Sequence, residues 1–300
     1  MTYPLKTLAI CLLVGCVAPM PAGDRQEFLF WSSSQLDNIE KKLHLHLDEP
    51  GKGANEKLMT SPKLSALMAY REGMPPQAEI HQKLGDFALI RDGDAAVLIG
   101  GKIADGKQSG PNEVRGTITG GTMQTLKTGD VIYIPPNMPH QWQIQPGKRM
   151  YLELFKIQPK SNGTEQPKYL YWSAGQLAAL DKKLKSSVDA SKSSHEDLVT
   201  ERFNTVVVHR EGSAGSEVHQ HLADFDIVRS GQGFMVLGGK MVEGKPTGPG
   251  EVRGKSIDGG TRQRVAAGDL LYIPANMPHQ FLAEPGQQFD VMVLKVWVQD

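Results

Sequence analysis

An internal repeat is the feature that most constrains how this chain can fold. Short runs recur at an offset of 138 to 141 residues along the body of the sequence. They include Trp31-Ser32 with Trp172-Ser173, Arg71-Glu72-Gly73 with Arg210-Glu211-Gly212, Glu113-Val114-Arg115-Gly116 with Glu251-Val252-Arg253-Gly254, and Asn137-Met138-Pro139-His140-Gln141 with Asn276-Met277-Pro278-His279-Gln280. The repeat predicts two homologous domains, at residues 24–158 and 168–300, joined by a linker at 159–167.

Each domain is expected to begin with a short helix and to continue as β-strands. Ser32 with Gln35, and Ser173 with Gln176, form S-x-x-Q capping boxes, and apolar residues follow at helical spacing. The later segments are short, rich in Val, Ile, Leu and aromatic residues, and bounded by Gly or Pro. They include 64–70, 95–99, 130–134, 205–210, 234–237, 269–273 and 289–298. Roughly eight strands in about 130 residues predict a mainly all-β fold with one double-sheet jelly roll per domain.

Composition excludes two kinds of partner and site. Basic and acidic residues number 33 each, so the formal net charge is zero, and no basic run indicates nucleic-acid binding. The only cysteines, Cys11 and Cys16, lie near the N-terminus. The body of the chain therefore has no disulfide, thiolate metal site or cysteine nucleophile.

Residues 1–23 have the pattern of a targeting leader. Lys6 precedes an apolar run at 8–17 that is too short to span a bilayer. Leu13-Val14-Gly15-Cys16 is similar to a bacterial lipobox, in which the cysteine becomes the lipidated first residue. The alternative is an ordinary secretory signal cut near Gly23. We expect an exported protein, either a periplasmic or outer-membrane lipoprotein or a secreted one, whose sole membrane contact is a lipid on Cys16.

Two stretches carry the chemistry. His219 and His221 are one residue apart, so a strand would direct both rings to the same face. Asp224 and Asp226 follow them, and about fifty residues later GDLLYIPANMPHQF supplies His279. Imidazoles and a carboxylate that converge from different strands are typical of a divalent-metal site.

These stretches resemble the paired motifs of the cupin superfamily, in which Gly, His-x-His, an acid and Gly are followed by Gly-Asp, Pro and a late His. The acid here is Asp instead of Glu. Asp224 is favoured as the ligand over Asp226 because it lies seven residues before Gly231. The resemblance implies a two-domain bicupin that binds one divalent ion (Mn, Fe, Zn, Ni or Cu) through His219, His221, Asp224 and His279.

The first repeat departs from this pattern. Lys83 stands where the second repeat has His221, and Ala88 stands where it has Asp226. A protonated lysine has no lone pair and repels a divalent ion. We therefore predict a metal-free N-terminal barrel in which Lys83 pairs with Asp86. The alternative is a triad of His81, Asp86 and His140.

Function is left as a choice between two classes. An open metal site in a barrel suits an enzyme acting on a small molecule, and the resemblance implies a dioxygenase, decarboxylase or isomerase. Asp226 is the spare carboxylate for acid–base work. The alternative is a binding protein for a small ligand, with a structural metal or none. Arg253 with Glu251 is either an anion-recognition pair or an ion pair that holds a hairpin, and a homo-oligomer is left open.

Overall fold

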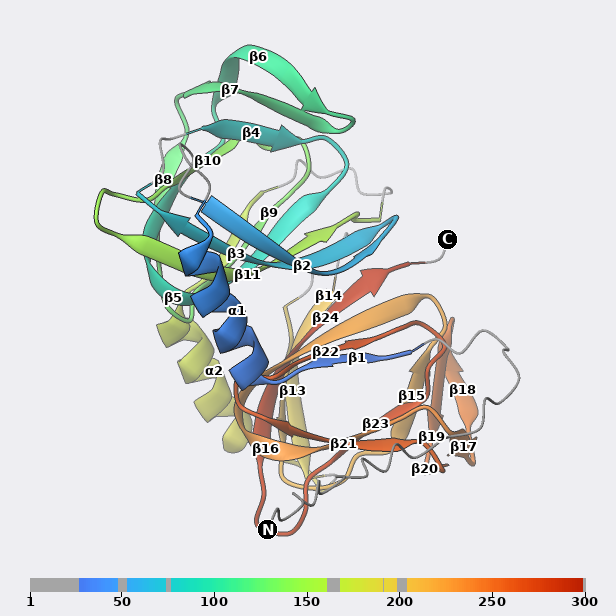
Figure 1. Cartoon of the computed structure of the whole chain (residues 1–300). Coiled ribbons are helices and arrows are strands. Elements are labelled where there is room, and N and C mark those ends of the chain that lie inside the picture. Colours follow the sequence, from blue (N-terminus) through green and yellow to red (C-terminus); the bar gives the residue numbers. More distant parts are fainter. Residues whose placement is uncertain are drawn as a thin grey trace, which may run out of the picture.

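The computed structural model describes residues 27–47, 53–73, 77–160, 168–190, 192–198 and 204–298. It contains two sheets of 11 strands each, one two-stranded sheet and two helices. Figure 1 shows the two large sheets as separate curled units stacked on each other, the N-terminal one above the C-terminal one. This is the expected mainly β architecture of two tandem cupin jelly rolls.

The N-terminal barrel follows the order β2-β3-β11-β5-β10-β4-β7-β6, with β8 and β9 pairing to β5. Its strands are β2 (Gly53–Ser61), β3 (Leu64–Glu72), β4 (Ala78–His81), β5 (Gly85–Ile99), β6 (Lys102–Gly110), β7 (Glu113–Thr119), β8 (Thr122–Lys127), β9 (Val131–Ile134), β10 (His140–Gln143) and β11 (Arg149–Ile157).

The C-terminal barrel repeats this topology in the order β13-β14-β24-β16-β23-β15-β19-β18, with β21 and β22 pairing to β16. Its strands are β13 (Ser193–Asp197), β14 (Asn204–Arg210), β15 (Ser216–His219), β16 (Leu222–Leu237), β18 (Lys245–Gly248), β19 (Glu251–Gly254), β21 (Thr261–Ala266), β22 (Leu270–Ile273), β23 (His279–Leu282) and β24 (Phe289–Trp297), beside the small pair β17 (Lys240–Val242) and β20 (Ser256–Asp258).

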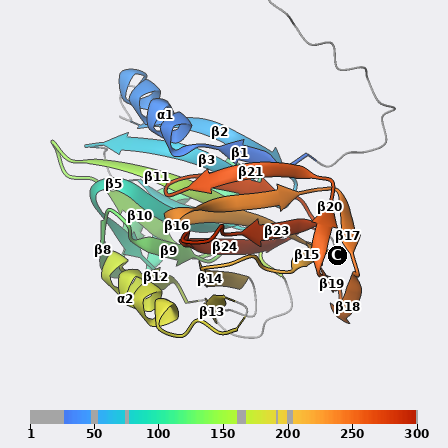
Figure 2. The same ribbon diagram turned by 90° about the horizontal axis from the view of Figure 1, so that it is seen from below.

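The two barrels exchange their first strands. β1 (Leu29–Trp31) pairs with β22 of the C-terminal barrel, whereas β12 (Leu170–Trp172) pairs with β9 of the N-terminal barrel. Each strand then leads into a helix that packs on its own half of the chain: α1 (Ser33–Leu45) contacts β2 and β3, and α2 (Ala174–Lys185) contacts β13 and β14. Figure 2 shows the helices on opposite sides of the stack.

Both predicted capping boxes are confirmed. Ser32 and Ser173 are the N-caps, each with its side chain accepting from the backbone N–H of the glutamine three residues on. The last turns carry basic side chains, which suit the negative end of the helix dipole. Leu36 and Leu43 of α1, like Leu177 and Leu184 of α2, are buried.

Hydrophobic side chains form three cores. One core fills each barrel, and a third joins the barrels to both helices. In the joining core the ring of Phe155 on β11 lies 4.7 Å from that of Phe225 on β16. Burying aromatic rings between the sheets is favourable because it removes a large apolar area from water. The barrels are therefore held together by packing as well as by the exchanged strands.

The predicted leader at 1–23 and most of the predicted linker lie outside the described residues. In the described part of the chain, no helix has both the length and the apolar character needed to span a membrane.

Candidate metal sites

Three cross-strand pairs build one side-chain cluster in the C-terminal barrel. Antiparallel register places Glu217 opposite His279, and His219 opposite Glu251. It also places Asp224 on β16 opposite Lys295 on β24. Facing side chains on antiparallel strands come within contact distance. As a result, ligand atoms of Glu217, His219 and His279 all lie within 4.8 Å of one another.

Both histidines present the same nitrogen to the centre of the cluster. Nδ1 of His219 lies 2.7 Å from a Glu251 carboxylate oxygen, which accepts its proton, and Nδ1 of His279 donates to the carbonyl of Met277 at 3.0 Å. These acceptors leave each Nε2 free to bind a cation. Nε2 of His279 is buried without a hydrogen-bond partner, 3.5 Å from Glu217 Oε1 and 3.6 Å from Asp224 Oδ2.

An ammonium group competes for this position. Lys295 Nζ lies 2.6 Å from His219 Nε2 and 3.0 Å from Asp224 Oδ2. The side chain is buried, with 15% of its surface exposed. Burial would lower its pKa, but the charges of Asp224 and Glu217 raise it, so the amine stays charged. A metal ion bound to His219 Nε2 would have to displace this ammonium.

Electrostatics fix the protonation of the other groups. Burial alone would raise the pKa of Asp224, but the charges of Lys295 and His219 hold it well below its usual value. Burial lowers the pKa of His219, but Asp224 and Glu251 raise it to about 9. Nε2 of His219 can therefore hold either a proton or the hydrogen bond from Lys295, and a metal ion would have to displace whichever of the two is there.

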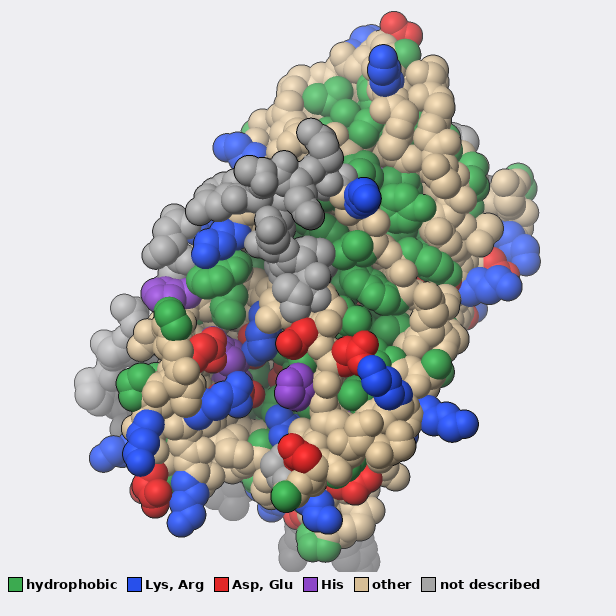
Figure 3. Space-filling model, turned by 180° about the vertical axis from the view of Figure 1, so that it is seen from behind, with side chains coloured by type: hydrophobic (Ala, Val, Ile, Leu, Met, Phe, Trp, Pro, Cys, Tyr) green, Lys and Arg blue, Asp and Glu red, His purple; other side chains and the backbone are tan. Residues whose placement is uncertain are grey.

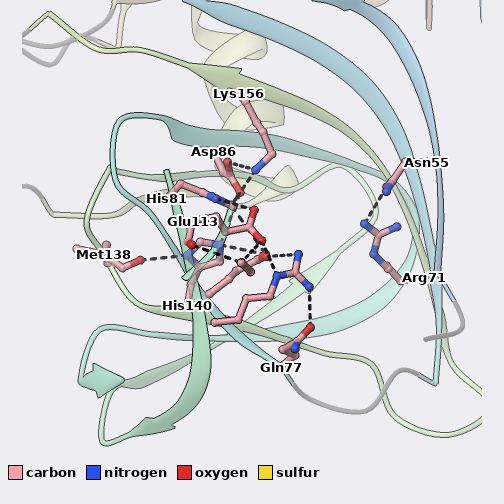
Figure 4. A network of polar contacts seen from close by, with 12 residues as sticks. Asn55, Arg71, Gln77, His81, Asp86, Glu113, Met138, His140 and Lys156 are labelled. Carbon is pink, nitrogen blue, oxygen red and sulfur yellow. Dashed lines mark hydrogen bonds and ion pairs between the residues drawn. The ribbon is translucent and has the colours of Figure 1, made fainter. Parts of the chain in front are cut away.

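The N-terminal barrel carries the same cluster, shown from close by in Figure 4. Register pairs Glu79 with His140, His81 with Glu113, and Asp86 with Lys156. Ligand atoms of Glu79, His81 and His140 again lie within 4.8 Å of one another. Lys156 Nζ lies 2.8 Å from His81 Nε2 and 2.9 Å from Asp86 Oδ1. The repeat has thus preserved the whole constellation.

The support around the two clusters differs. Glu113 is 3.6 Å from His81 Nδ1, beyond hydrogen-bond distance, and its other oxygen accepts from Arg115 Nε. In the C-terminal barrel, Glu251 bonds His219 directly, and Arg253 pairs with Glu217 at 3.0 Å. The orienting carboxylate therefore bonds its histidine in the C-terminal cluster, whereas in the N-terminal cluster it bonds an arginine instead.

Three of the four predicted ligands come together, and the fourth lies elsewhere. His219, Asp224 and His279 meet in the cluster. β15 ends at His219, and a bend at the next two residues takes His221 out of the strand phase. Its ring stacks on Trp297, with centroids 6.4 Å apart and an interplanar angle of 20°.

Two further expectations concern lysine and the spare acid. The ammonium beside Asp86 belongs to Lys156, whereas Lys83, expected there, is exposed. Asp226 is 1% exposed, and neither carboxylate oxygen has a hydrogen-bond partner among the described residues. Burial, with the nearby charge of Asp224, raises its pKa to about 7. Asp226 is thus a buried acid that can hold a proton near neutral pH.

Sequence reasoning missed Glu217, Lys295 and the role of Glu251. A weak signal for Glu217 was present, because an acid stands two residues before the first histidine in both repeats, on the same face of a strand. Nothing local indicates Lys295, which meets Asp224 only through the register of strands 71 residues apart.

A cavity of about 380 Å³ opens over the C-terminal cluster. Glu217, His219, Asp224 and Lys295 line it together with Arg210, Arg253 and an apolar wall. The C-terminal barrel forms the lower half of the molecule in Figure 3. There, acidic, basic and histidine side chains are gathered around a hollow. A smaller cavity of about 300 Å³ lies over the N-terminal cluster.

The cluster fits a divalent ion. Two imidazoles and adjacent carboxylates form the donor set that Mn, Fe, Ni and Zn accept. The unpartnered Nε2 of His279 and Oδ1 of Asp224 are buried polar atoms that a cation would satisfy. The residues in both barrels thus form candidate metal sites, and these atoms do not select one metal.

Comparison with solved structures identifies the fold. The salicylate 1,2-dioxygenase of Pseudaminobacter salicylatoxidans matches with a TM-score of 0.64 at 12% identity, over 94% of this chain and 87% of that one. A single-residue variant of that enzyme in complex with gentisate matches with a TM-score of 0.62 at 12% identity, over 95% and 86%. A cupin 2 conserved barrel domain protein from Leptotrichia buccalis matches with a TM-score of 0.50 at 13% identity, over 84% and 92%.

Comparisons of the sequence with protein-family models and with curated proteins give no match. The similarity is therefore one of fold, spread over nearly the whole length of these structures. Together with the duplicated barrel and its duplicated cluster, it shows that this chain has the fold of a bicupin.

Proposed function

We propose that this protein is a metal-dependent enzyme that acts on a small molecule in its C-terminal barrel. The observation that carries the proposal is the convergence of His219 and His279 with Glu217, each imidazole held by an acceptor on Nδ1. Such oriented Nε2 atoms beside a cavity are a means of holding a metal with positions open to a substrate.

One metal per chain, in the C-terminal barrel, remains part of the proposal, but on a new basis. The exposed Lys83 no longer supports it, because both barrels have the same inner residues. Its support is now Glu251, which bonds His219 directly, whereas Glu113 is drawn away by Arg115. Losing such an orienting partner typically costs about 10- to 100-fold in metal affinity.

The chain's own groups have separate tasks in this proposal. His219, His279 and Glu217 would hold the ion, with Asp224 beside them and Glu251 fixing the ring of His219. When bound, the metal would supply a Lewis acid and a site for oxygen or a substrate oxygen. Asp226, with its pKa raised to about 7, would hold a proton beneath the cluster.

Dioxygenase chemistry is the reaction that we favour, because the structures with the higher TM-scores are those of a salicylate 1,2-dioxygenase. Decarboxylation and isomerisation need the same elements. Oxygen uptake with a panel of small organic acids would distinguish the first from the other two.

Metal titration of the purified mature protein tests the site. Calorimetry with Mn²⁺, Fe²⁺ (anaerobically), Ni²⁺ and Zn²⁺ should give one equivalent. His219→Ala and His279→Ala should each weaken binding at least about tenfold, and Glu251→Gln should weaken it by about 10- to 100-fold.

Matched variants in the other barrel serve as controls. His140→Ala and Glu113→Gln, with the exposed His46→Ala, should leave that equivalent unchanged. Binding of two equivalents of metal, one of which is lost when the histidines of either barrel are substituted, would refute the single-site proposal. It would leave the proposal of a metal-dependent enzyme standing. Metal binding that is unaffected in the double variant His219→Ala, His279→Ala would refute both.

A non-catalytic binding protein is the second candidate, favoured by one contact. Lys295 Nζ already occupies the lone pair of His219 and pairs with Asp224, which partly neutralises the cluster. A barrel stabilised in this way could capture a small ligand without metal. Ligand binding with full affinity in chelator-treated protein, and no turnover with any metal, would support this candidate.

Export is also proposed, from the leader at 1–23 alone. Acylation of Cys16 would tether the mature chain to a membrane. Mass spectrometry of the native N-terminus should find an acylated Cys16, whereas an unmodified N-terminus near Asp24 would indicate simple secretion.

A further inference from the structure

Arg210 lines the cavity over the C-terminal cluster and makes no ion pair with any other described residue. It follows Val206 and Val208 on the same face of β14, and all three line the cavity. Its Nε is buried and has no hydrogen-bond partner. Between the described residues, no hydrogen bond or ion pair to its guanidinium is found. Its guanidinium lies over the ring of Phe281, 5.2 Å from the ring centroid.

The same arginine in the first repeat, Arg71, makes three hydrogen bonds. Arg71 donates to the backbone carbonyls of Ala54 and Tyr70, at 3.0 and 2.8 Å, and to Asn55 Oδ1 at 2.8 Å. Figure 4 shows Arg71 bonded to Asn55, to one side of the cluster. An arginine with these bonds has few donors left for a ligand.

One residue accounts for much of this difference. Asn55 lies opposite Ala69 in the β2–β3 ladder, and His195 lies opposite Val208 at the matching place in the β13–β14 ladder. The amide oxygen that binds Arg71 is therefore replaced by an imidazole, which makes no recorded hydrogen bond to Arg210. His195 is exposed and lines the cavity.

Three acids that line this cavity already pair with other cations. Glu217 pairs with Arg253 at 3.0 Å, Asp224 with Lys295 at 3.0 Å, and Glu251 with His219 at 2.7 Å. Asp197 lines the same cavity as an exposed residue. Among the described arginines and lysines that line the cavity, Arg210 is thus the one that makes no ion pair.

We propose that Arg210 recognises the carboxylate of a small organic acid in this cavity. A guanidinium matches a carboxylate with two parallel N–H donors. The hydrocarbon part of the acid would pack on Val206, Val208 and Phe281, the apolar wall beside it. Glu217, Asp224 and Glu251 line the same cavity and would repel a doubly charged phosphate more than a singly charged carboxylate. This deepens the proposed function by naming its substrate class.

Calorimetry on the mature chain after chelator treatment tests the proposal without its depending on a metal. Benzoate is the carboxylate probe, and benzamide is its uncharged counterpart of the same shape. Wild type should bind benzoate at least about tenfold more tightly than benzamide, because hydrogen bonds between charged groups are roughly twice as strong as those between neutral ones. Arg210→Gln should remove that preference, and Arg210→Lys should restore part of it.

The repeat provides a matched control and a second variant. Arg71→Gln, at the same place in the other barrel, should leave benzoate binding unchanged. His195→Asn should weaken benzoate binding while every cluster residue is kept, because it gives Arg210 the acceptor that Arg71 has. Its thermal unfolding should match that of wild type.

Two results would overturn the assignment. One is wild type that binds neither probe, or binds benzoate no better than Arg210→Gln does. The other is inorganic phosphate bound more tightly than benzoate, which would make the cavity a phosphate site. Because the benzoate assay contains no metal, its result tests Arg210 even if the metal titrations fail.

Discussion

The two barrels of this chain have the same cluster in different surroundings. Each holds two histidines, two glutamates, an aspartate and a lysine in the same three cross-strand pairs. In the N-terminal barrel, Arg115 donates a hydrogen bond to the orienting glutamate, Glu113, and Asn55 accepts one from Arg71. In the C-terminal barrel the glutamate bonds its histidine, and Nε of Arg210 has no hydrogen-bond partner among the described residues.

The difference shows where function can diverge after a duplication. The inner residues are fixed by strand register, since each contacts a neighbour across a ladder that the fold itself needs. The residues one layer out are free to change, and they decide which inner groups remain available to a ligand. Asn55 and His195 are such a pair.

The largest expected effect tests whether the barrels are one cooperative unit. Phe155 contacts Phe225 of the other barrel and lies 6.2 Å from Phe87 of its own. Phe155→Ala should lower the free energy of unfolding by about 3–5 kcal/mol, because it leaves a cavity in the shared core. Urea denaturation followed by fluorescence and circular dichroism measures it.

A barrel-specific result would argue against that shared core. If fluorescence and circular dichroism report two separate unfolding transitions, and Phe155→Ala shifts the midpoint of only one, the barrels unfold independently. Phe234→Ala is the control, because Phe234 is half-buried on the C-terminal barrel beside Arg262, outside the joining core. It should cost less than Phe155→Ala.

The second effect concerns the lysines within the clusters. Lys295→Met should raise metal affinity at the C-terminal site, since it removes a positive charge that lies on His219 Nε2. Two unit charges 4 Å apart interact by about 4 kcal/mol at an effective dielectric of 20, an upper bound. We expect a gain of about 10- to 100-fold, measured by competition with a metal chelator.

Lys156→Met sharpens the comparison. If the charge of Lys156 weakens metal binding more than the missing Glu113–His81 hydrogen bond does, this variant should bind a second metal ion measurably. If the missing hydrogen bond weakens binding more, the second site should stay weak. A Lys295→Met variant that binds metal less tightly would mean that the lysine helps to hold the ion instead of competing with it.

Much of the fold could be predicted from the sequence, because its signals are local or repeated. The capping boxes at Ser32 and Ser173 and the duplicated motifs each act within a few residues. The exchange of β1 and β12 could not be predicted. Both strands are three residues long, and their partners lie in the other barrel.

The site was predicted in part for the same reason. His219, His279 and Asp224 belong to motifs, and the structure brings these three side chains together. His221 was included because a strand was assumed to continue through it, but β15 ends at His219. Lys295 was missed because only the register of β16 with β24 brings it to Asp224. A contact across strands distant in sequence leaves no trace in a short motif.

The smallest effect concerns how each helix is attached to its barrel. In the N-terminal half the hydroxyl of Tyr151 donates to the carbonyl of Leu36 in α1 at 2.6 Å. The corresponding residue in the C-terminal half is Asp290, which is 1% exposed. It accepts from His209 at 2.6 Å and from Ser230, and pairs with Lys185 of α2 at 3.3 Å. At this position the attachment is neutral in one barrel and charged in the other, whereas an arginine–aspartate pair joins each helix to its barrel in both, Arg91 with Asp37 and Arg229 with Asp181.

The charged attachment should weaken in acid. Burial would raise the pKa of Asp290, but the hydrogen bonds from Ser230 and His209 and the charge of Lys185 hold it below its usual value. Because the folded pKa lies below that of the unfolded chain, about 3.9, its stabilisation is present above that pH. It is lost as the pH falls through the folded value. Asp290→Asn should cost about 1–3 kcal/mol near pH 7, from the loss of charged hydrogen bonds.

Urea unfolding between pH 7 and pH 3 measures this pH dependence. The gap in unfolding free energy between wild type and Asp290→Asn should shrink below pH about 4, as the wild-type carboxyl gains a proton. Other buried acids, such as Asp224, titrate in both proteins and therefore cancel in the difference. Tyr151→Phe removes the neutral attachment, so its gap from wild type should stay constant over the same range. An Asp290→Asn gap that also stays constant would show that this carboxylate carries no charge-dependent stability, and the two attachments would then be equivalent.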